Sequence, residues 1–128
     1  MFERLEKIIE NAYVPMSDFR VASIVVDTKG ESYEGVNVEN PSLKDGLCAE
    51  QVAIATALSL GVKKKDLVEL HLLSDSKRLA SPCFLCRQLL IENLSSNAKI
   101  FLYDHEGRTK ELVLADLCPY PFDEEDLK

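Results

Sequence analysis

The sequence lacks the features that would direct it to a membrane or to nucleic acid. Its 128 residues contain no apolar run that approaches the ~20 residues a membrane-spanning helix needs. Acidic residues outnumber basic ones by 22 to 15, and the net charge of −7 would repel both phosphate backbones and anionic lipid surfaces. We therefore expect no nucleic acid and no membrane among its partners.

Other absences narrow the function further. The chain has only five glycines and no glycine-rich loop of the kind that cradles phosphates. Its first twelve residues, MFERLEKIIENA, predict an amphipathic helix and lack the apolar centre and cleavage site of an export signal. No repeat, low-complexity tract or linker divides the sequence. We expect one domain over residues 1–128, located in the cytoplasm.

Cysteine is infrequent, but three of the four cysteines are arranged around two short motifs. The cysteines are Cys48, Cys83, Cys86 and Cys118. In the reducing cytoplasm they are expected to be free thiols rather than disulfides. Clustered free thiols indicate metal binding or redox chemistry.

The hydrophobic pattern predicts an α/β fold. Helices are expected over residues 2–12, 48–60 and 82–94, and strands over 21–28, 32–39, 68–74, 99–103 and 108–113. Ser81 is the expected N-cap of the third helix, with Pro82 at its first position. Hairpins at both ends and strand–helix alternation between them predict a mixed five-stranded sheet with helices on its faces.

The segments Cys48-Ala49-Glu50 and Pro82-Cys83-Phe84-Leu85-Cys86 each open a predicted helix. Helix N-termini favour thiolates, and three thiolates with an open fourth position are typical of catalytic zinc. A carboxylate such as Glu50 beside that metal could act as a general acid and base. The two segments together match the signature of the zinc deaminases.

Several alternatives remain open at this level. The Cys-x-x-C pair alone could be a thioredoxin-like redox site, and Cys48 alone could be a small buried apolar residue. Cys118 is expected to pack in the tail; if it closed a four-thiolate structural site, Glu50 would have no role. His71 and His105 have no ligand spacing, so we expect them to be structural or solvated.

From about Ala12 to Leu127 the chain resembles the small homotetrameric cytidine deaminases of nucleoside salvage. The resemblance is carried by the two cysteine motifs and by AYVPMSDFRVASIVV, GVNVEN and LCPYPFDEEDL. It implies a three-layer α-β-α deaminase fold, one Zn²⁺ per chain and a homotetramer. It also implies hydrolytic conversion of cytidine and deoxycytidine to uridine and deoxyuridine, with release of ammonia.

The resemblance also implies roles for individual residues. Zinc would be held by Cys48, Cys83 and Cys86, and Glu50 would move protons among the water, the ring nitrogen and the leaving amine. Contacts to the nucleoside would come from Phe19, Asn37, Glu39, Ala49, Pro82 and Phe122. Asn37 and Glu39 would bind the ribose hydroxyls; they lie two apart on a predicted strand and therefore share a face. Phe122 would reach the site of a neighbouring subunit.

The chain departs from this family at several positions. Gln51 stands where an arginine usually follows Cys-Ala-Glu. We expect Arg87, the helix dipoles and a hydrogen bond from Gln51 to a sulfur to offset the charge of three thiolates. Bulky Phe84 and Leu85 separate the paired cysteines.

Met16 and Leu43 occupy positions where aromatic residues are common, and all these departures bear on the substrate range. A blasticidin S-type aminonucleoside deaminase therefore remains an alternative substrate class. A non-catalytic zinc-stabilised binding module is an alternative of another class, and Glu50 argues against it.

Overall fold

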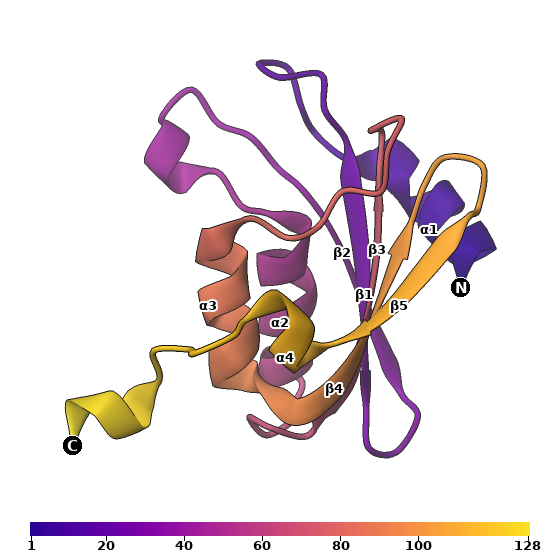
Figure 1. Cartoon of the computed structure of the whole chain (residues 1–128). Coiled ribbons are helices and arrows are strands. Elements are labelled where there is room, and N and C mark those ends of the chain that lie inside the picture. Colours follow the sequence, from indigo (N-terminus) through magenta and orange to yellow (C-terminus); the bar gives the residue numbers. More distant parts are fainter.

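A five-stranded mixed sheet forms the centre of the protein (Figure 1). The structure is a computed structural model that describes the backbone of residues 1–128 and every side chain except that of Leu43. The strands are β1 (Val21–Asp27), β2 (Ser32–Val36), β3 (Leu67–Ser74), β4 (Leu94–Tyr103) and β5 (Thr109–Val113). The helices are α1 (Phe2–Ile8), α2 (Ala49–Ser59), α3 (Phe84–Asn93) and α4 (Leu114–Leu117).

The strand order is β2-β1-β3-β4-β5, in which β3 and β4 run parallel and the other neighbours run antiparallel. Helix α1 lies on one face of the sheet, and α2, α3 and α4 lie on the other (Figure 1). The sequence-based prediction of an α/β fold with three layers is therefore confirmed. Among the described residues, none of the helices has the length and apolarity to span a membrane.

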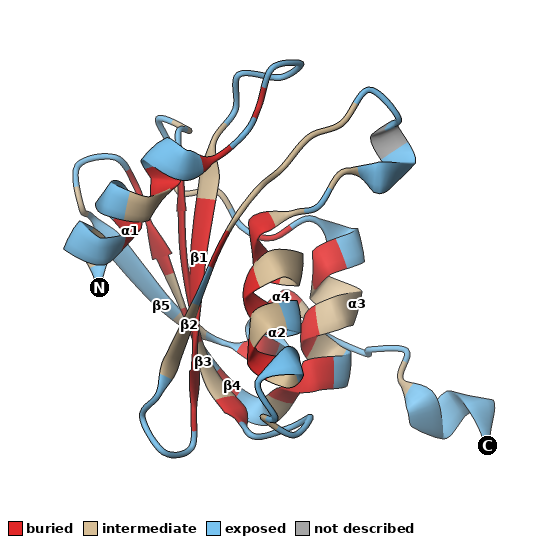
Figure 2. Ribbon diagram, turned by 180° about the vertical axis from the view of Figure 1, so that it is seen from behind, coloured by how far each residue is buried: buried red, intermediate tan, exposed pale blue. Residues whose placement is uncertain are grey.

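Alternating side chains of β1 build a core on each face of the sheet. Ala22 and Ile24 pack with Leu5 and Ile9 of the N-terminal helical segment, whereas Val25 packs with residues of α2 and α3. Both faces of the strand are buried, which explains why its sequence is apolar except for Ser23 and Asp27 (Figure 2).

Helix α2 lies unusually close to the edge strand β2. A Cβ added at Gly35 would stand 2.4 Å from the backbone nitrogen of Ala53 and 2.6 Å from the carbonyl oxygen of Ala49. Ala49, Ala53 and Ala57 are fully buried, so the small residues of both elements allow this approach. The start of α2, which carries the Cys-Ala-Glu motif, is thereby fixed against the sheet.

Some predicted boundaries were wrong. The first helix ends at Ile8 and continues as a 3-10 turn over Ile9–Asn11. Strand β2 ends at Val36 rather than at residue 39, because Val38 bridges to Tyr13 and Leu47. Helix α3 begins at Phe84 with Cys83 as its N-cap, because the backbone of Cys83 is extended.

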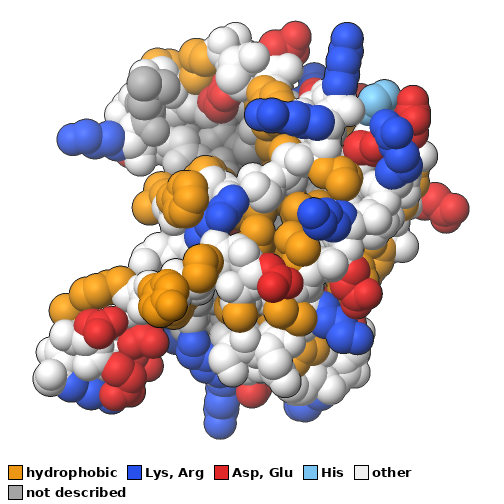
Figure 3. All heavy atoms as spheres, viewed as in Figure 1, with side chains coloured by type: hydrophobic (Ala, Val, Ile, Leu, Met, Phe, Trp, Pro, Cys, Tyr) orange, Lys and Arg blue, Asp and Glu red, His pale blue; other side chains and the backbone are white. Residues whose placement is uncertain are grey.

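Two further segments have more regular structure than the sequence predicted. Strand β4 starts five residues earlier than expected, at Leu94, and α4 and a 3-10 turn over Glu124–Leu127 form in the tail. The C-terminal segment extends from the body beyond α3 (Figure 1) and presents a group of acidic side chains (Figure 3).

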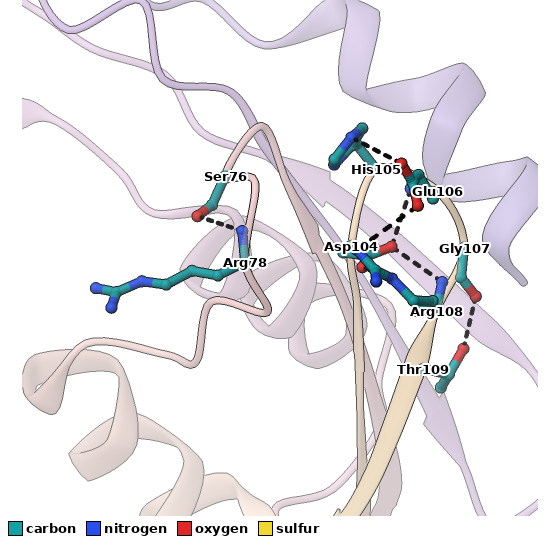
Figure 4. Close-up of polar contacts among 8 residues, drawn as sticks. All are labelled: Ser76, Arg78, Asp104, His105, Glu106, Gly107, Arg108 and Thr109. Carbon is teal, nitrogen blue, oxygen red and sulfur yellow. Dashed lines mark hydrogen bonds and ion pairs between the residues drawn. The ribbon is translucent and has the colours of Figure 1, made fainter.

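The turn between β4 and β5 is stabilised by one buried carboxylate. Asp104 accepts hydrogen bonds from the backbone N–H groups of Glu106 and Arg108 and forms an ion pair with the Arg108 guanidinium at 2.6 Å (Figure 4). His105, next to it, is exposed, and His71 is buried in β3 between Glu69 and Tyr103. The expectation that both histidines are structural or solvated is confirmed.

Candidate active site

The starts of α2 and α3 bring three thiols together. Cys48 is the N-cap of α2, Cys83 is the N-cap of α3, and Cys86 lies in the first turn of α3. Their sulfur atoms all lie within 4.8 Å of one another. Cys118 is not part of this group; it is half-buried against α3, with its sulfur 3.9 Å from the carbonyl oxygen of Arg87. The predicted trio is therefore confirmed, and a four-thiolate site is not formed by the described residues.

The spacing of the three sulfurs fits a zinc ion. Zinc–sulfur bonds of about 2.3 Å in a tetrahedron place neighbouring sulfurs about 3.8 Å apart, so the observed group needs only a small contraction. A tetrahedral ion held by this trio keeps one position for a water or a substrate. The donor set is typical of catalytic rather than structural zinc.

Hydrogen bonding within the trio favours a thiolate. The pKa of Cys48 is lowered to about 7, first by a hydrogen bond from Cys86. The pKa of Cys86 is raised, because the same bond holds its proton and burial adds to the effect. The two helix N-termini contribute partial positive charge at the same place.

Glu50 lies in the first turn of α2 and is only 4% exposed. Burial raises the pKa of its carboxyl, with smaller opposing effects from its own backbone N–H and from Cys86. A buried carboxyl beside three thiols is costly for stability alone. A buried carboxyl with a raised pKa beside a cavity makes Glu50 a candidate for a functional role.

A cavity of about 240 Å³ opens onto this group. Its lining includes most of the residues that the sequence nominated: Phe19, Asn37, Cys48, Ala49, Glu50, Pro82 and Cys83. Val21, Leu72, Ser74, Ala80 and Ser81 complete it. The start of β1, the end of β3 and the residue after β2 meet here, so the cavity lies at one end of the sheet.

Asn37 and Glu39 hold the segment that leads into β1. The Asn37 side chain accepts from the Val21 N–H at 2.9 Å and donates to the Phe19 carbonyl at 2.8 Å. Glu39 Oε1 accepts from the N–H groups of Met16 and Ser17, each at 3.0 Å. The pKa of Glu39 is lowered, first by the hydrogen bond from Ser17. Glu39 is not part of the cavity lining.

Phe122 lies away from the cavity of its own chain. It lines a separate surface pocket with Lys64, Gln88 and the acidic end of the tail, and its carbonyl accepts from Gln88 Nε2 at 2.7 Å. Phe84 and Leu85 point to solvent, with exposures of 78% and 68%, and Met16 is also exposed. Leu43, noted as a departure from the family, lies outside the described side chains.

Gln51 faces the Cys48 sulfur with its backbone N–H, whereas its side-chain amide donates to no sulfur among the described residues. The Gln51 side-chain oxygen accepts from the Cys48 backbone N–H at 2.7 Å. This reciprocal capping satisfies donors at the helix start and orients Cys48. Arg87 is likewise directed to oxygen acceptors, not to the thiols.

The sequence did not nominate Leu72, Ser74, Ala80 or Ser81 as cavity residues. Leu72 and Ser74 are two apart at the end of β3, so their side chains share one face of the sheet. This spacing predicts the shared face but gives no sign that a cavity lies there. Ala80 and Ser81 directly precede the Pro82-Cys83 motif, which is the one local signal that could have identified them.

Comparisons with known proteins agree with this geometry. The model of the cytidine and deoxycytidylate deaminase zinc-binding region matches residues 1–102. The chain belongs to the cytidine and deoxycytidylate deaminase family. A cytidine deaminase from Halalkalibacterium halodurans is 35% identical over 118 residues, which cover 92% of this chain and 88% of the relative. One from Mycoplasma genitalium is 34% identical over 117 residues, with 91% and 88% covered.

Solved structures of family members share the fold. The crystal structure of cytidine deaminase from Burkholderia pseudomallei superposes with a TM-score of 0.89 at 30% identity, covering 94% of each chain. That of Mycobacterium tuberculosis gives a TM-score of 0.76 at 32% identity, covering 95% of this chain and 97% of the other. The deaminase family therefore accounts for both the three-thiol site and the sheet that carries it.

Proposed function

We propose that this protein is a zinc-dependent hydrolase that deaminates cytidine and deoxycytidine to uridine and deoxyuridine. The observation that carries the proposal is a buried Glu50 beside three converging thiols, at a cavity that also presents Asn37 and Phe19. The cavity of about 240 Å³ is smaller than the ~300–1,000 Å³ of drug-sized sites, so it would take the pyrimidine ring while the ribose extends past Asn37 toward Glu39, outside its lining. Relatives named as cytidine deaminases over most of the chain support this substrate.

The residues have distinct tasks in this reaction. Zinc bound by Cys48, Cys83 and Cys86 would lower the pKa of a water molecule enough to supply a nucleophile near neutral pH. Glu50 would accept one proton from the attacking water and pass it to the ring nitrogen next to the amine-bearing carbon, as the water oxygen bonds to that carbon. Glu50 would then take the second proton of that water, now a hydroxyl on the same carbon, and deliver it to the amine. As the carbon–nitrogen bond breaks, ammonia leaves and the ring carbonyl forms.

The cavity wall would hold the base. The N–H groups of the first turn of α2 have no acceptor within the helix, so the N–H of Ala49 can donate to the ring carbonyl. Phe19 and Pro82 line the cavity and can pack against the base. Glu50 is buried, so bulk water has little access to the proton path.

The ribose would be bound by Asn37 and Glu39. Each side chain is held in place by backbone groups, and each keeps one polar group, an amide hydrogen or Oε2, without a partner among the described residues. Preorganised groups of this kind bind hydroxyls at low entropic cost. Without ribose they would lack partners, and sites built for a substrate hydroxyl strongly reject analogues that lack it.

A homotetramer is the proposed assembly. Phe122 does not reach the cavity of its own chain, so a role in nucleoside binding needs a neighbouring subunit. A surface groove along α2, lined by apolar residues that include Leu47, Val52 and Leu58, offers one face for such contacts. Sedimentation of a fully active monomer would contradict this proposal. The cytoplasm remains the expected location.

Substrate comparison tests the function. Cytidine, cytosine, cytidine monophosphate and blasticidin S are incubated with the zinc-loaded protein, and ammonia release and ultraviolet absorbance are followed. Cytidine should have the highest kcat/KM, and Glu39→Ala should lower the value for cytidine while hardly changing that for cytosine. A preference for cytosine or the monophosphate, or deamination of blasticidin S alone, would overturn the ribose assignment.

A further inference from the structure

The Arg87 guanidinium connects three segments around the metal centre and donates to oxygen atoms rather than to the three thiols. Its Nε donates to the Pro82 carbonyl at 2.8 Å, Nη2 to Ser81 Oγ at 2.9 Å, and Nη1 to the Leu117 carbonyl at 2.9 Å. All three acceptors are oxygen atoms of the chain itself. A planar guanidinium can satisfy such a set at once, whereas a lysine ammonium is a point charge on a flexible stem.

Phe84 holds this guanidinium from one side. The Arg87 Cζ atom lies 4.4 Å from the centroid of the Phe84 ring, in a cation–π arrangement. Phe84 is 78% exposed, so its ring contributes little to the core. Its contact with the Arg87 guanidinium is the interaction that the structure assigns to this ring. The bulky residue between the paired cysteines thus restricts the orientation of Arg87.

The acceptors of Arg87 matter because of where they lie. Ser81 and Pro82 directly precede Cys83 and line the cavity, and the Arg87 N–H donates to the Cys83 carbonyl at 2.8 Å. The backbone on both sides of the Pro82–Cys83 peptide is therefore tied to one residue of α3. Cys83 is the exposed member of the trio, so it has less packing than Cys86 to keep its sulfur in place.

The Leu117 contact extends this connection to the tail. Leu117 ends α4, and Gln88, the neighbour of Arg87, holds the Phe122 carbonyl five residues later. The side chains of Arg87 and Gln88 therefore both donate hydrogen bonds to the C-terminal tail. Of the two, only Arg87 also bonds to the Ser81–Pro82 segment.

We propose that Arg87 is a positioning residue for the metal centre, which retains zinc by fixing the Ser81–Pro82 approach to Cys83. The inference rests on the zinc site of the proposed function but not on the substrate. Partners that orient metal ligands typically change metal affinity or activity by about 10–100-fold when removed. Arg87 acts at the backbone of a ligand, so the same range is expected for zinc retention.

Zinc transfer to a chromophoric chelator tests the proposal, with no substrate present. Arg87→Met keeps most of the aliphatic stem and should release zinc about 10–100-fold faster than the parent. Circular dichroism at the assay temperature confirms that the variant is folded. Arg87→Lys keeps the charge but cannot reach three acceptors in one plane, so it should also release zinc faster than the parent.

Two matched controls isolate the contacts that matter. Gln88→Met removes the hydrogen bond to the Phe122 carbonyl and a longer one to Glu92 Oε1 at 3.4 Å. Neither involves the Ser81–Pro82 segment, so this variant should release zinc at the parental rate. Arg78→Met removes a positive charge from the same loop; the Arg78 side chain points away from its neighbours (Figure 4), and only its backbone N–H bonds to Ser76 Oγ. It too should behave like the parent.

The outcomes separate this inference from the proposed function. A parent protein that binds no zinc would contradict the proposed function. A parent that binds zinc, with Arg87→Met releasing it at the parental rate, would overturn only the positioning role. Parental release by Arg87→Lys would show that charge alone suffices, and equal loss in Gln88→Met would assign the effect to tail docking; either result overturns the proposal.

Discussion

The close approach of α2 to β2 predicts a large effect for Gly35→Ala. The new Cβ would lie 2.4 Å from the Ala53 nitrogen and 2.6 Å from the Ala49 oxygen, both backbone atoms. Ordinary contacts need about 3.5 Å, so the helix and strand must separate by roughly 1 Å. No rotamer change relieves this, because the atoms that clash belong to the helix backbone.

The magnitude follows from overpacking in a well-packed core. Such insertions typically cost about 1–3 kcal/mol, and a rigid backbone neighbour places this one at the upper end. A chain of this size loses roughly 3–5 °C in Tm per kcal/mol, so thermal unfolding should shift down by about 5–15 °C. The start of α2 carries Cys48 and Glu50, so kcat/KM for cytidine should fall at least tenfold, since ~1 Å errors at a site can cost 100-fold.

Gly61→Ala is the matched control. Gly61 has φ +98° and open space at its Cβ position, so alanine there is strained only by its backbone, at about 1–2 kcal/mol. It should lower Tm and leave kcat/KM unchanged, because it lies at the far end of α2. Gly35→Ala with a Tm within about 2 °C of the parent and parental turnover would refute the reasoning.

Three further predictions concern the site and its surroundings. Glu50→Gln should retain zinc and fold while losing at least the ~10²–10⁴-fold that general acid–base catalysis supplies; metal analysis and turnover check this, and near-parental activity would assign the base elsewhere. Chelation of zinc should lower Tm, and added zinc should restore it, because ligand binding and folding are coupled; an unchanged Tm would contradict a bound metal. Burial lowers the pKa of His71 below its ordinary 6.5, despite the opposing Glu69, so the folded protein binds fewer protons than the unfolded one. The stabilisation that depends on neutral His71 is therefore fully present above about pH 6.5 and is lost as the pH falls. His71→Gln should flatten the decline in the free energy of unfolding, measured in urea between pH 7.5 and 5.5. An identical slope in both proteins would count against the buried-histidine account.

The metal centre could be predicted from the sequence because its signals are local. Cys48, Cys83 and Cys86 mark helix starts, and their spacing and neighbours limit the chemistry. The start of α3 was nevertheless placed two residues early, because Ser81-Pro82 is also a good helix opening. In the fold, Ser81 Oγ accepts from Arg87 instead of capping the helix.

The cavity wall depends on contacts that no local pattern contains. Asn37 was predicted on a strand, but its side chain accepts from Val21 and donates to Phe19, in a segment far from it in sequence. The Asn37 N–H still donates to the Val21 carbonyl of β1, but the regular pairing ends at Val36 because Val38 bridges to Tyr13 and Leu47. Such choices are decided by tertiary pairing, which overrides strand propensity.

The charge distribution around the site bears on which substrate can enter. Three thiolates exceed the charge of one Zn²⁺, and Glu50 adds another acidic group in the same buried region. Gln51 brings no positive charge, and the guanidinium of Arg87 is directed to three oxygen acceptors of the chain. The helix N-termini contribute only partial charges within their first turns. A phosphate would therefore enter a region of like charge in a protein of net charge −7, whereas a neutral nucleoside would not. We therefore expect the residues that hold the metal to favour the nucleoside over its monophosphate, which the substrate comparison measures directly.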